Sequence, residues 1–124
     1  MASIAGGCLC ERLRYNVSAE PSNPHYCSCR QCQRWSGAPV VAWIDAPLGA
    51  TRIDGAPAWH RSSERAQRGF CPSCGSAIFY RSDDAQSIGI TTASLDEPDR
   101  FRPVKWSYPA SAAIWLPHML DSAK

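Results

Sequence analysis

The sequence predicts a mainly β domain that is held together by metal-binding cysteines. Ten prolines and eight glycines are spread among short apolar runs in 124 residues, which is typical of strands joined by tight turns. The seven cysteines include Cys-x-Cys and Cys-x-x-Cys spacings, which bring thiolates onto a common ion. At this length we expect residues 1–124 to form a single zinc-binding domain with a modest core, to whose stability bound metal would add.

Most of the predicted elements are short strands. Leu13, Tyr15 and Val17 alternate with polar residues, the pattern of a half-buried strand that the prolines of residues 21–24 then end. Apolar or alternating runs elsewhere predict further strands, with Trp43 in the core. The expected strands cover residues 13–17, 40–44, 59–63, 77–80, 87–91, 104–106 and 112–115.

The connections between these strands carry turn signals. Residues 29–36 predict a short helical turn that ends at Gly37, with Pro39 beyond it. Residues 46–55 carry proline and glycine at hairpin-like spacing, and residues 95–99 form an acidic turn. Gly75 follows a Cys-x-x-Cys pair and permits the positive φ that such turns need.

The cysteines divide into two groups that could each hold zinc. Seven is an odd number, so disulfides alone cannot pair them all. A closed four-sulfur site needs two pairs of ligands, and three remaining cysteines would leave a fourth position open, where chemistry can occur. The closed set is Cys8, Cys10, Cys71 and Cys74; the open set is Cys27, Cys29 and Cys32. On an extended strand Cys8 and Cys10 would share a face.

Other arrangements of the cysteines satisfy parts of this pattern. A single zinc ribbon would use Cys29 and Cys32 with Cys71 and Cys74, and a disulfide framework or an iron–sulfur centre at the triplet would also use thiols. His25 is a possible fourth ligand because it lies two residues before Cys27, although a partly exposed loop position suits it better. His60 is expected to face solvent from a polar strand.

Charge and targeting signals limit the classes of function. The formal charge is +2, and 11 of the 13 basic residues are arginine, which suits recognition of carboxylates. Seven thiolates and two Zn²⁺ ions would shift the net charge to about −1, so the basic residues do not indicate nucleic-acid binding. Residues 1–7 lack the features of a signal peptide, and no apolar run is long enough to span a membrane. Free thiols in such a chain lead us to expect a cytoplasmic protein.

Motifs along nearly the whole chain resemble the glutathione-dependent formaldehyde-activating enzyme family, which also includes centromere protein V. They occur in the family's order. The matching residues are Gly7-Cys8-Leu9-Cys10, Cys27-Ser28-Cys29-Arg30-Gln31-Cys32, Gly37-Ala38-Pro39, Ser62-Ser63, Arg68-Gly69-Phe70-Cys71-Pro72-Ser73-Cys74-Gly75, Leu95-Asp96-Glu97-Pro98 and Trp115-Leu116-Pro117. The resemblance implies a β-tent fold of packed antiparallel sheets around a structural zinc.

The resemblance also implies roles for the two groups of cysteines. The four-cysteine set would hold the structural zinc, and the triplet a catalytic zinc. Because it has only three protein ligands, we expect the second ion to be lost more easily. The family name implies that S-(hydroxymethyl)glutathione is formed, a reaction of the carbon–sulfur lyase class run in reverse.

Three thiolates make a zinc ion electron-rich, and such an ion prefers a substrate thiol over water as its fourth ligand. Our hypothesis is that the thiol loses its proton there and attacks a small carbonyl such as formaldehyde, giving a hemithioacetal. The candidates for binding the carboxylates of glutathione are Arg30, Arg34, Arg61 and Arg68. The alternatives are a zinc-stabilised module that binds a thiol or a protein without turnover, and a lyase that acts on another thiol adduct.

Overall fold

The computed structural model describes residues 3–117, which contain ten strands and the helix α1 (Arg30–Ser36). Four short 3₁₀ turns are η1 (Leu48–Ala50), η2 (Thr92–Ser94), η3 (Pro98–Arg100) and η4 (Pro109–Ser111). The strands are β1 (Ile4–Gly7), β2 (Arg14–Val17), β3 (Ser22–Cys27), β4 (Val41–Pro47), β5 (Thr51–Asp54), β6 (Ala58–Arg61), β7 (Ala66–Phe70), β8 (Ala77–Ser82), β9 (Ser87–Thr91) and β10 (Lys105–Ser107).

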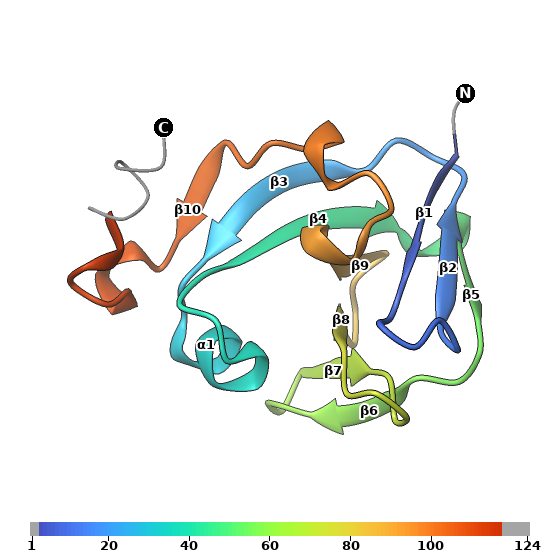
Figure 1. Cartoon of the computed structure of the whole chain (residues 1–124), viewed down its shortest axis with the longest axis horizontal. Coiled ribbons are helices and arrows are strands. Elements are labelled where there is room, and N and C mark those ends of the chain that lie inside the picture. Colours follow the sequence, from blue (N-terminus) through green and yellow to red (C-terminus); the bar gives the residue numbers. More distant parts are fainter. Residues whose placement is uncertain (1–2, 118–124) are drawn as a thin grey trace.

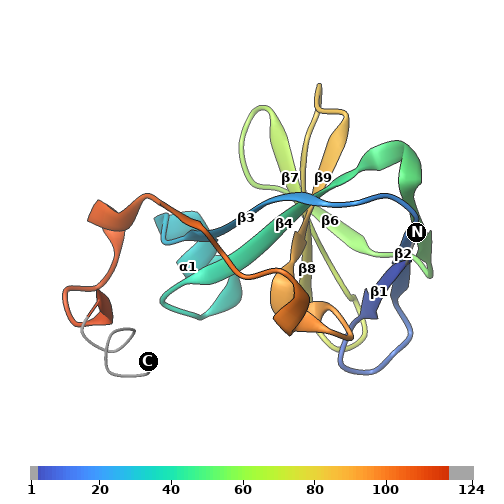
Figure 2. The ribbon, with the colours of Figure 1, turned by 90° about the horizontal axis from the view of Figure 1, so that it is seen from above.

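The strands form two sheets. The smaller has the order β1-β2-β5, and the larger has the order β10-β3-β4-β9-β8-β7-β6. Every pair is antiparallel except β10 and β3, which run parallel. The small sheet lies at the opposite end of the structure from α1 (Figures 1 and 2). The predicted mainly β fold of packed antiparallel sheets is confirmed. No helix in the described part of the chain is long and apolar enough to cross a membrane.

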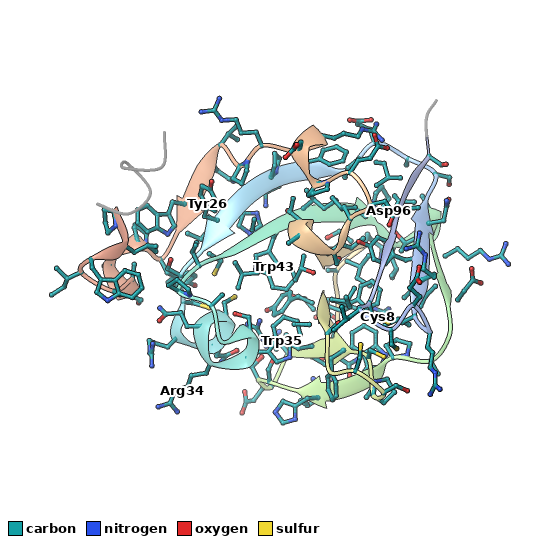
Figure 3. The ribbon with its side chains drawn as sticks, viewed as in Figure 1. Cys8, Tyr26, Arg34, Trp35, Trp43 and Asp96 are labelled. Carbon is teal, nitrogen blue, oxygen red and sulfur yellow. The ribbon has the colours of Figure 1, made fainter. Side chains whose placement is uncertain are left out.

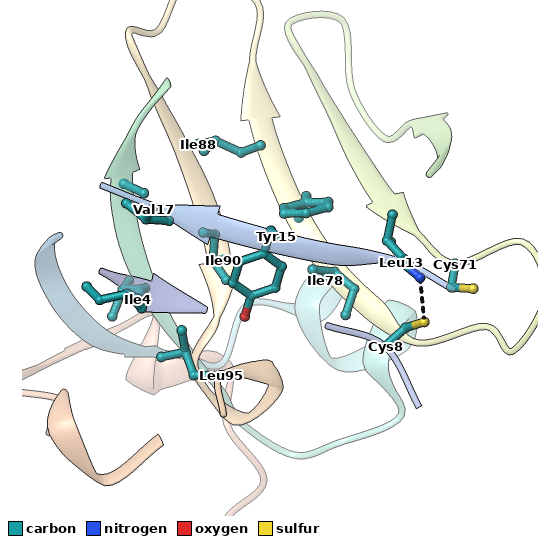
Figure 4. Close-up of a cluster of buried hydrophobic side chains, with 13 residues drawn as sticks. Ile4, Cys8, Leu13, Tyr15, Val17, Cys71, Ile78, Ile88, Ile90 and Leu95 are labelled. Carbon is teal, nitrogen blue, oxygen red and sulfur yellow. Dashed lines mark hydrogen bonds between the residues drawn. The ribbon is translucent and has the colours of Figure 1, made fainter. Parts of the chain in front are cut away.

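The main core lies between the two sheets (Figure 4). Leu13, Tyr15 and Val17 are at most 2% exposed, which confirms the predicted alternation. The Tyr15 ring packs edge-on against Phe79, with ring centroids 5.6 Å apart. Burying each large apolar side chain contributes about 1.5–3 kcal/mol, so the interface between the sheets is the main apolar contribution to stability.

Helix α1 is short, and it ends at Gly37 as the sequence predicts. The Cys29 Sγ atom accepts a hydrogen bond from the Cys32 N–H at 3.3 Å and so caps the N-terminus. Gly37 has a φ of 74°, and its N–H donates to the Gln33 carbonyl at 2.8 Å. A seven-residue helix is marginal alone, and the indole of Trp35 anchors this one by stacking on Trp43 at 5.9 Å.

The structure differs from the sequence-based expectations at β3. Residues 22–26, expected to be a turn and a lead-in to the cysteines, belong to a strand. Asn23 takes a φ of 55°, and the β3–β4 register shifts between Ser22 and His25. This irregularity accommodates Pro24, which has no N–H to donate to a neighbouring strand.

Three further expectations were wrong. Residues 46–55 do not form a hairpin, because β4 pairs within the large sheet and β5 within the small one. Residues 66–70 form β7, where we expected only a lead-in to the cysteine turn. Residues 112–115 form no strand: Ile114 is 92% exposed, and the Leu116 N–H donates to the Ala113 carbonyl in a turn.

Candidate active and metal-binding site

The cysteine triplet lies where β3 ends and α1 begins. Cys27 is the last residue of β3, Cys29 caps the helix, and Cys32 lies in its first turn. The three Sγ atoms are all within 4.8 Å of one another, and those of Cys27 and Cys32 are 3.4 Å apart. One strand end and one helical turn therefore bring all three sulfurs together.

The four remaining cysteines meet where the turn after β1 meets the turn after β7. Their Sγ atoms also lie within 4.8 Å of one another. The Cys8–Cys10 distance is 3.6 Å, and the Cys10–Cys71 distance is 3.8 Å. Cys8 and Cys10 are not on a strand as we expected, but in a turn that Glu11 continues with a φ of 66°. Figure 4 shows Cys8 and Cys71 beside Leu13 at the edge of the core.

The donor sets of both groups fit zinc. Two sulfurs on one tetrahedral zinc lie roughly 3.8 Å apart, given Zn–S bonds of about 2.3 Å. The sulfur pairs that are in contact here lie 3.4–3.8 Å apart. Four thiolates fill a tetrahedral site, and three leave one position open.

The structure excludes two alternatives for the cysteines. Cys29 and Cys32 lie in one group and Cys71 and Cys74 in the other, so they do not form a single ribbon. All seven cysteines are free thiols, so a disulfide framework is also wrong.

Arg68, on β7, supplies a buried positive charge beside the triplet. The residue is 4% exposed, and its Nη1 donates to the Cys32 Sγ at 3.5 Å while Nη2 donates to the Gln31 Oε1 at 3.4 Å. Its guanidinium lies 5.2 Å from the Trp35 ring centroid and 5.0 Å from that of Tyr80. A buried cation requires a compensating negative charge, which the Cys32 thiolate can supply.

Hydrogen bonding sets the protonation of the thiols. The contact with Cys27 and the guanidinium of Arg68 lower the pKa of Cys32 to about 5, although burial opposes this. The same contact with Cys32, together with burial, raises the pKa of Cys27. In the other group, hydrogen bonds from Ser76 lower the pKa of Cys74 to about 5. Each group therefore holds a cysteine with a lowered pKa, which favours the thiolate form that binds metal.

The triplet opens onto a cavity of about 580 Å³, within the range of small-molecule sites. Trp43 and Tyr80 form an aromatic wall, and their rings lie 6.2 Å apart in an edge-on arrangement. Figure 3 shows Trp35 and Trp43 between α1 and the large sheet. The lining residues are Asn23, His25, Cys27, Cys29, Arg30, Gln31, Cys32, Trp43, Asp45, Ser63, Arg68, Tyr80, Gly89, Ser107 and Tyr108.

The structure separates the four candidate arginines. Arg68 and Arg30 line the cavity. Arg34 lies on the outer side of α1 and borders a second depression of about 340 Å³, which Arg30 also lines (Figure 3). Arg61 is ion-paired with Asp83 at 3.0 Å and is not among the residues that line the cavity.

His25 lines the cavity from β3, where we expected a loop position. Its Nδ1 bonds with the Asn23 carbonyl at 2.6 Å, and its ring nitrogens are not grouped with the three sulfurs. His60 is exposed as expected.

Several lining residues were missed because their signals are weak. Trp43 was assigned to the core alone, and Asp45, two residues further along the same buried strand, was not singled out. The available signal was the position of Asp45 two residues after Trp43 in an apolar strand, because positions i and i+2 share a face of a strand.

The fold and these two cysteine groups define a class of protein: a small β protein with one closed and one open set of thiolates. The profile of the family described as glutathione-dependent formaldehyde-activating enzyme matches residues 3–111. The chain therefore belongs to the glutathione-dependent formaldehyde-activating enzyme family.

Two individual proteins are also similar to this chain. An uncharacterized lyase of Schizosaccharomyces pombe is 25% identical over 80 residues, or 64% of this chain and 58% of that protein. The match thus spans less than two thirds of the curated relative. The crystal structure of a Rhodobacter sphaeroides protein superposes with a TM-score of 0.65 at 25% identity, covering 83% of this chain and 99% of that one.

Proposed function

We propose that residues 1–124 act as a single zinc-binding domain with two zinc ions, and that the protein is a carbon–sulfur lyase. The reaction adds a thiol, glutathione, to a small carbonyl such as formaldehyde, or reverses that addition. A sulfur–carbon bond forms, the carbonyl becomes a hydroxyl, and the thiol proton ends on that oxygen. In this proposal Cys8, Cys10, Cys71 and Cys74 hold a structural ion, and Cys27, Cys29 and Cys32 hold the catalytic and more easily lost one.

The observation that carries this proposal is the three-sulfur group at the wall of a cavity. The four-sulfur group is complete and packs against the core, whereas the triplet has three ligands and lines a space large enough for a small molecule. Zinc held by three thiolates would accept a substrate sulfur as its fourth ligand and lower that thiol's pKa.

The chain's own residues supply positioning around this group. Arg68 is held by hydrogen bonds and by two aromatic rings, so it fixes the Cys32 sulfur. Trp43 and Tyr80 form an apolar wall that limits water beside the reacting sulfur. Arg30, exposed at the cavity, is placed to meet a substrate carboxylate.

Formaldehyde and thiols also combine without a catalyst, so the test must measure rates above that background. Exchange between glutathione and its hydroxymethyl adduct can be followed by NMR exchange spectroscopy with and without the zinc-loaded protein. We expect faster exchange that saturates with glutathione and disappears in Cys29→Ser. An exchange rate equal to the background would contradict the proposed reaction. Tight glutathione binding without acceleration would instead support the thiol-binding module.

A further inference from the structure

The cavity at the cysteine triplet carries opposite charges at its two ends. Arg30 and Arg68 lie beside the sulfurs, whereas Asp45 lines the cavity from β4. Val41, the register partner of Cys27, precedes Asp45 by four residues on β4. At a rise of about 3.3 Å per residue the two positions are roughly 13 Å apart.

Asp45 occupies an unusual place for a carboxylate. Strand β4 lies inside the seven-stranded sheet between β3 and β9, and its neighbouring residues Ile44 and Ala46 are fully buried on the opposite face. Asp45 shares its face with Trp43, so its side chain faces the cavity. A half-buried charge in such a position is costly unless a partner compensates it.

The described residues supply only part of that compensation. The Asn23 Nδ2 donates to the Asp45 Oδ2 at 2.8 Å. Oδ1 has no hydrogen bond within residues 3–117, and no arginine, lysine or histidine among them lies within 4.0 Å of the carboxylate. The negative charge of Asp45 is therefore available to pair with a cation from outside the described residues.

Asn23 is held in a conformation that serves this contact. Its φ of 55° lies in the left-handed region, at the irregular part of the β3–β4 pairing. Such conformations cost free energy and concentrate at functional sites. The irregular backbone presents the Asn23 amide to Asp45, which fixes the carboxylate at the cavity wall.

We propose that Asp45, oriented by Asn23, binds the free amino group of the thiol substrate. The site thus selects thiols whose amine is about eight bonds from the sulfur, as it is in a γ-glutamyl-cysteinyl compound. This inference rests on the proposed function of the triplet as the thiol site. In glutathione the sulfur is on the central residue, and about eight bonds separate it from the amine of the γ-linked glutamyl residue. Such a chain reaches roughly 10 Å when extended, which together with the Asp45 side chain covers the distance to the triplet. The amine of free cysteine lies too close to its sulfur to reach Asp45.

The test is a binding cycle in which both the carboxylate and the amine are removed. Dissociation constants of the zinc-loaded protein are measured by calorimetry for glutathione and for glutathione acetylated on its α-amino group. Asp45→Asn keeps the volume and an acceptor for Asn23, and Asp84→Asn removes an exposed charge in the turn before β9 as the matched control.

We expect Asp45→Asn to weaken glutathione binding about tenfold, the loss of one charge-assisted hydrogen bond. Acetylation of the ligand should weaken its binding to the wild type by a similar factor. It should hardly change the affinity of Asp45→Asn, and it should weaken binding to Asp84→Asn as much as to the wild type. Equal affinities of the wild type for the two ligands would overturn the inference, and that comparison needs no variant to fold. The inference would also be overturned if Asp45→Asn weakened the binding of both ligands by the same factor. If the wild type binds neither ligand, the proposed function fails first, and this inference fails with it.

Discussion

The two cysteine groups should differ in what they contribute to folding, and serine substitutions separate them. Cys71 is 1% exposed and joins segments 61 residues apart, because its sulfur contacts that of Cys10. Cys27, Cys29 and Cys32 lie within six consecutive residues. Metal held between distant segments restricts the unfolded chain more than metal held within a short loop does. We therefore expect Cys71→Ser to unfold the protein more readily than Cys29→Ser.

The magnitude follows from the ligand count and the local contacts. Structural zinc contributes about 10–16 kcal/mol to folding, so losing one of four ligands costs roughly 2.5–4 kcal/mol. For a chain of this length that corresponds to a fall in Tm of roughly 10–15 °C. Cys29 caps α1 through its sulfur, and a serine hydroxyl caps at least as well. Cys29→Ser should therefore shift Tm by only about 1–3 °C.

Thermal unfolding followed by circular dichroism on the zinc-loaded proteins measures both values, and a chelated wild-type sample gives the metal-free limit. Activity towards glutathione and formaldehyde should be lost in Cys29→Ser although that variant stays folded. If Cys29→Ser unfolds at a temperature as low as Cys71→Ser does, the division into structural and functional groups is wrong.

Two further predictions concern charged side chains. Arg68→Met should lower both the zinc affinity of the triplet and the activity by about 10–100-fold, because loss of a residue that orients a metal ligand typically has an effect of this size. Competition with a chelator measures the zinc affinity, and Arg52→Met is the exposed control. An unchanged zinc affinity in Arg68→Met would contradict the positioning role of Arg68. Arg14, 2.6 Å from Asp96, holds the pKa of that carboxyl below its usual value, so the pair stabilises the fold at neutral pH, and this contribution is lost as the pH falls through the lowered pKa. Asp96→Asn should cost less than about 1 kcal/mol at pH 7 because both side chains are partly exposed. Denaturant titrations should show the stability difference between the two proteins shrinking as the pH falls below about 4 and vanishing once the pH is below the lowered pKa of Asp96. A difference that does not shrink on acidification would refute the assignment.

Features of the site that depend on residues close together in the chain could be predicted from the sequence. The cysteine spacings predicted both groups, because a Cys-x-x-Cys turn brings sulfurs together wherever it lies. The helix α1 was predictable from its end signal at Gly37. The alternation of Leu13, Tyr15 and Val17 gave β2 for the same reason, since a period of two is a local property.

The sequence failed where the partner of a segment lies far along the chain. Nothing near residues 46–55 shows that β4 and β5 belong to different sheets, because sheet membership depends on the distant strands β9 and β2. The strand β3 was missed because Pro24 normally ends a strand, and only the left-handed Asn23 makes it compatible. Arg61 looked like any other candidate arginine until its pairing with Asp83 was visible.

The central claim is that the chain carries one closed and one open zinc site. Native mass spectrometry of the purified protein, with and without glutathione, counts the ions directly. We expect two zinc ions per chain, one of which is lost in Cys29→Ser, and a glutathione adduct that forms only when the second ion is present. One zinc per chain, unaffected by Cys29→Ser and indifferent to glutathione, would contradict the account.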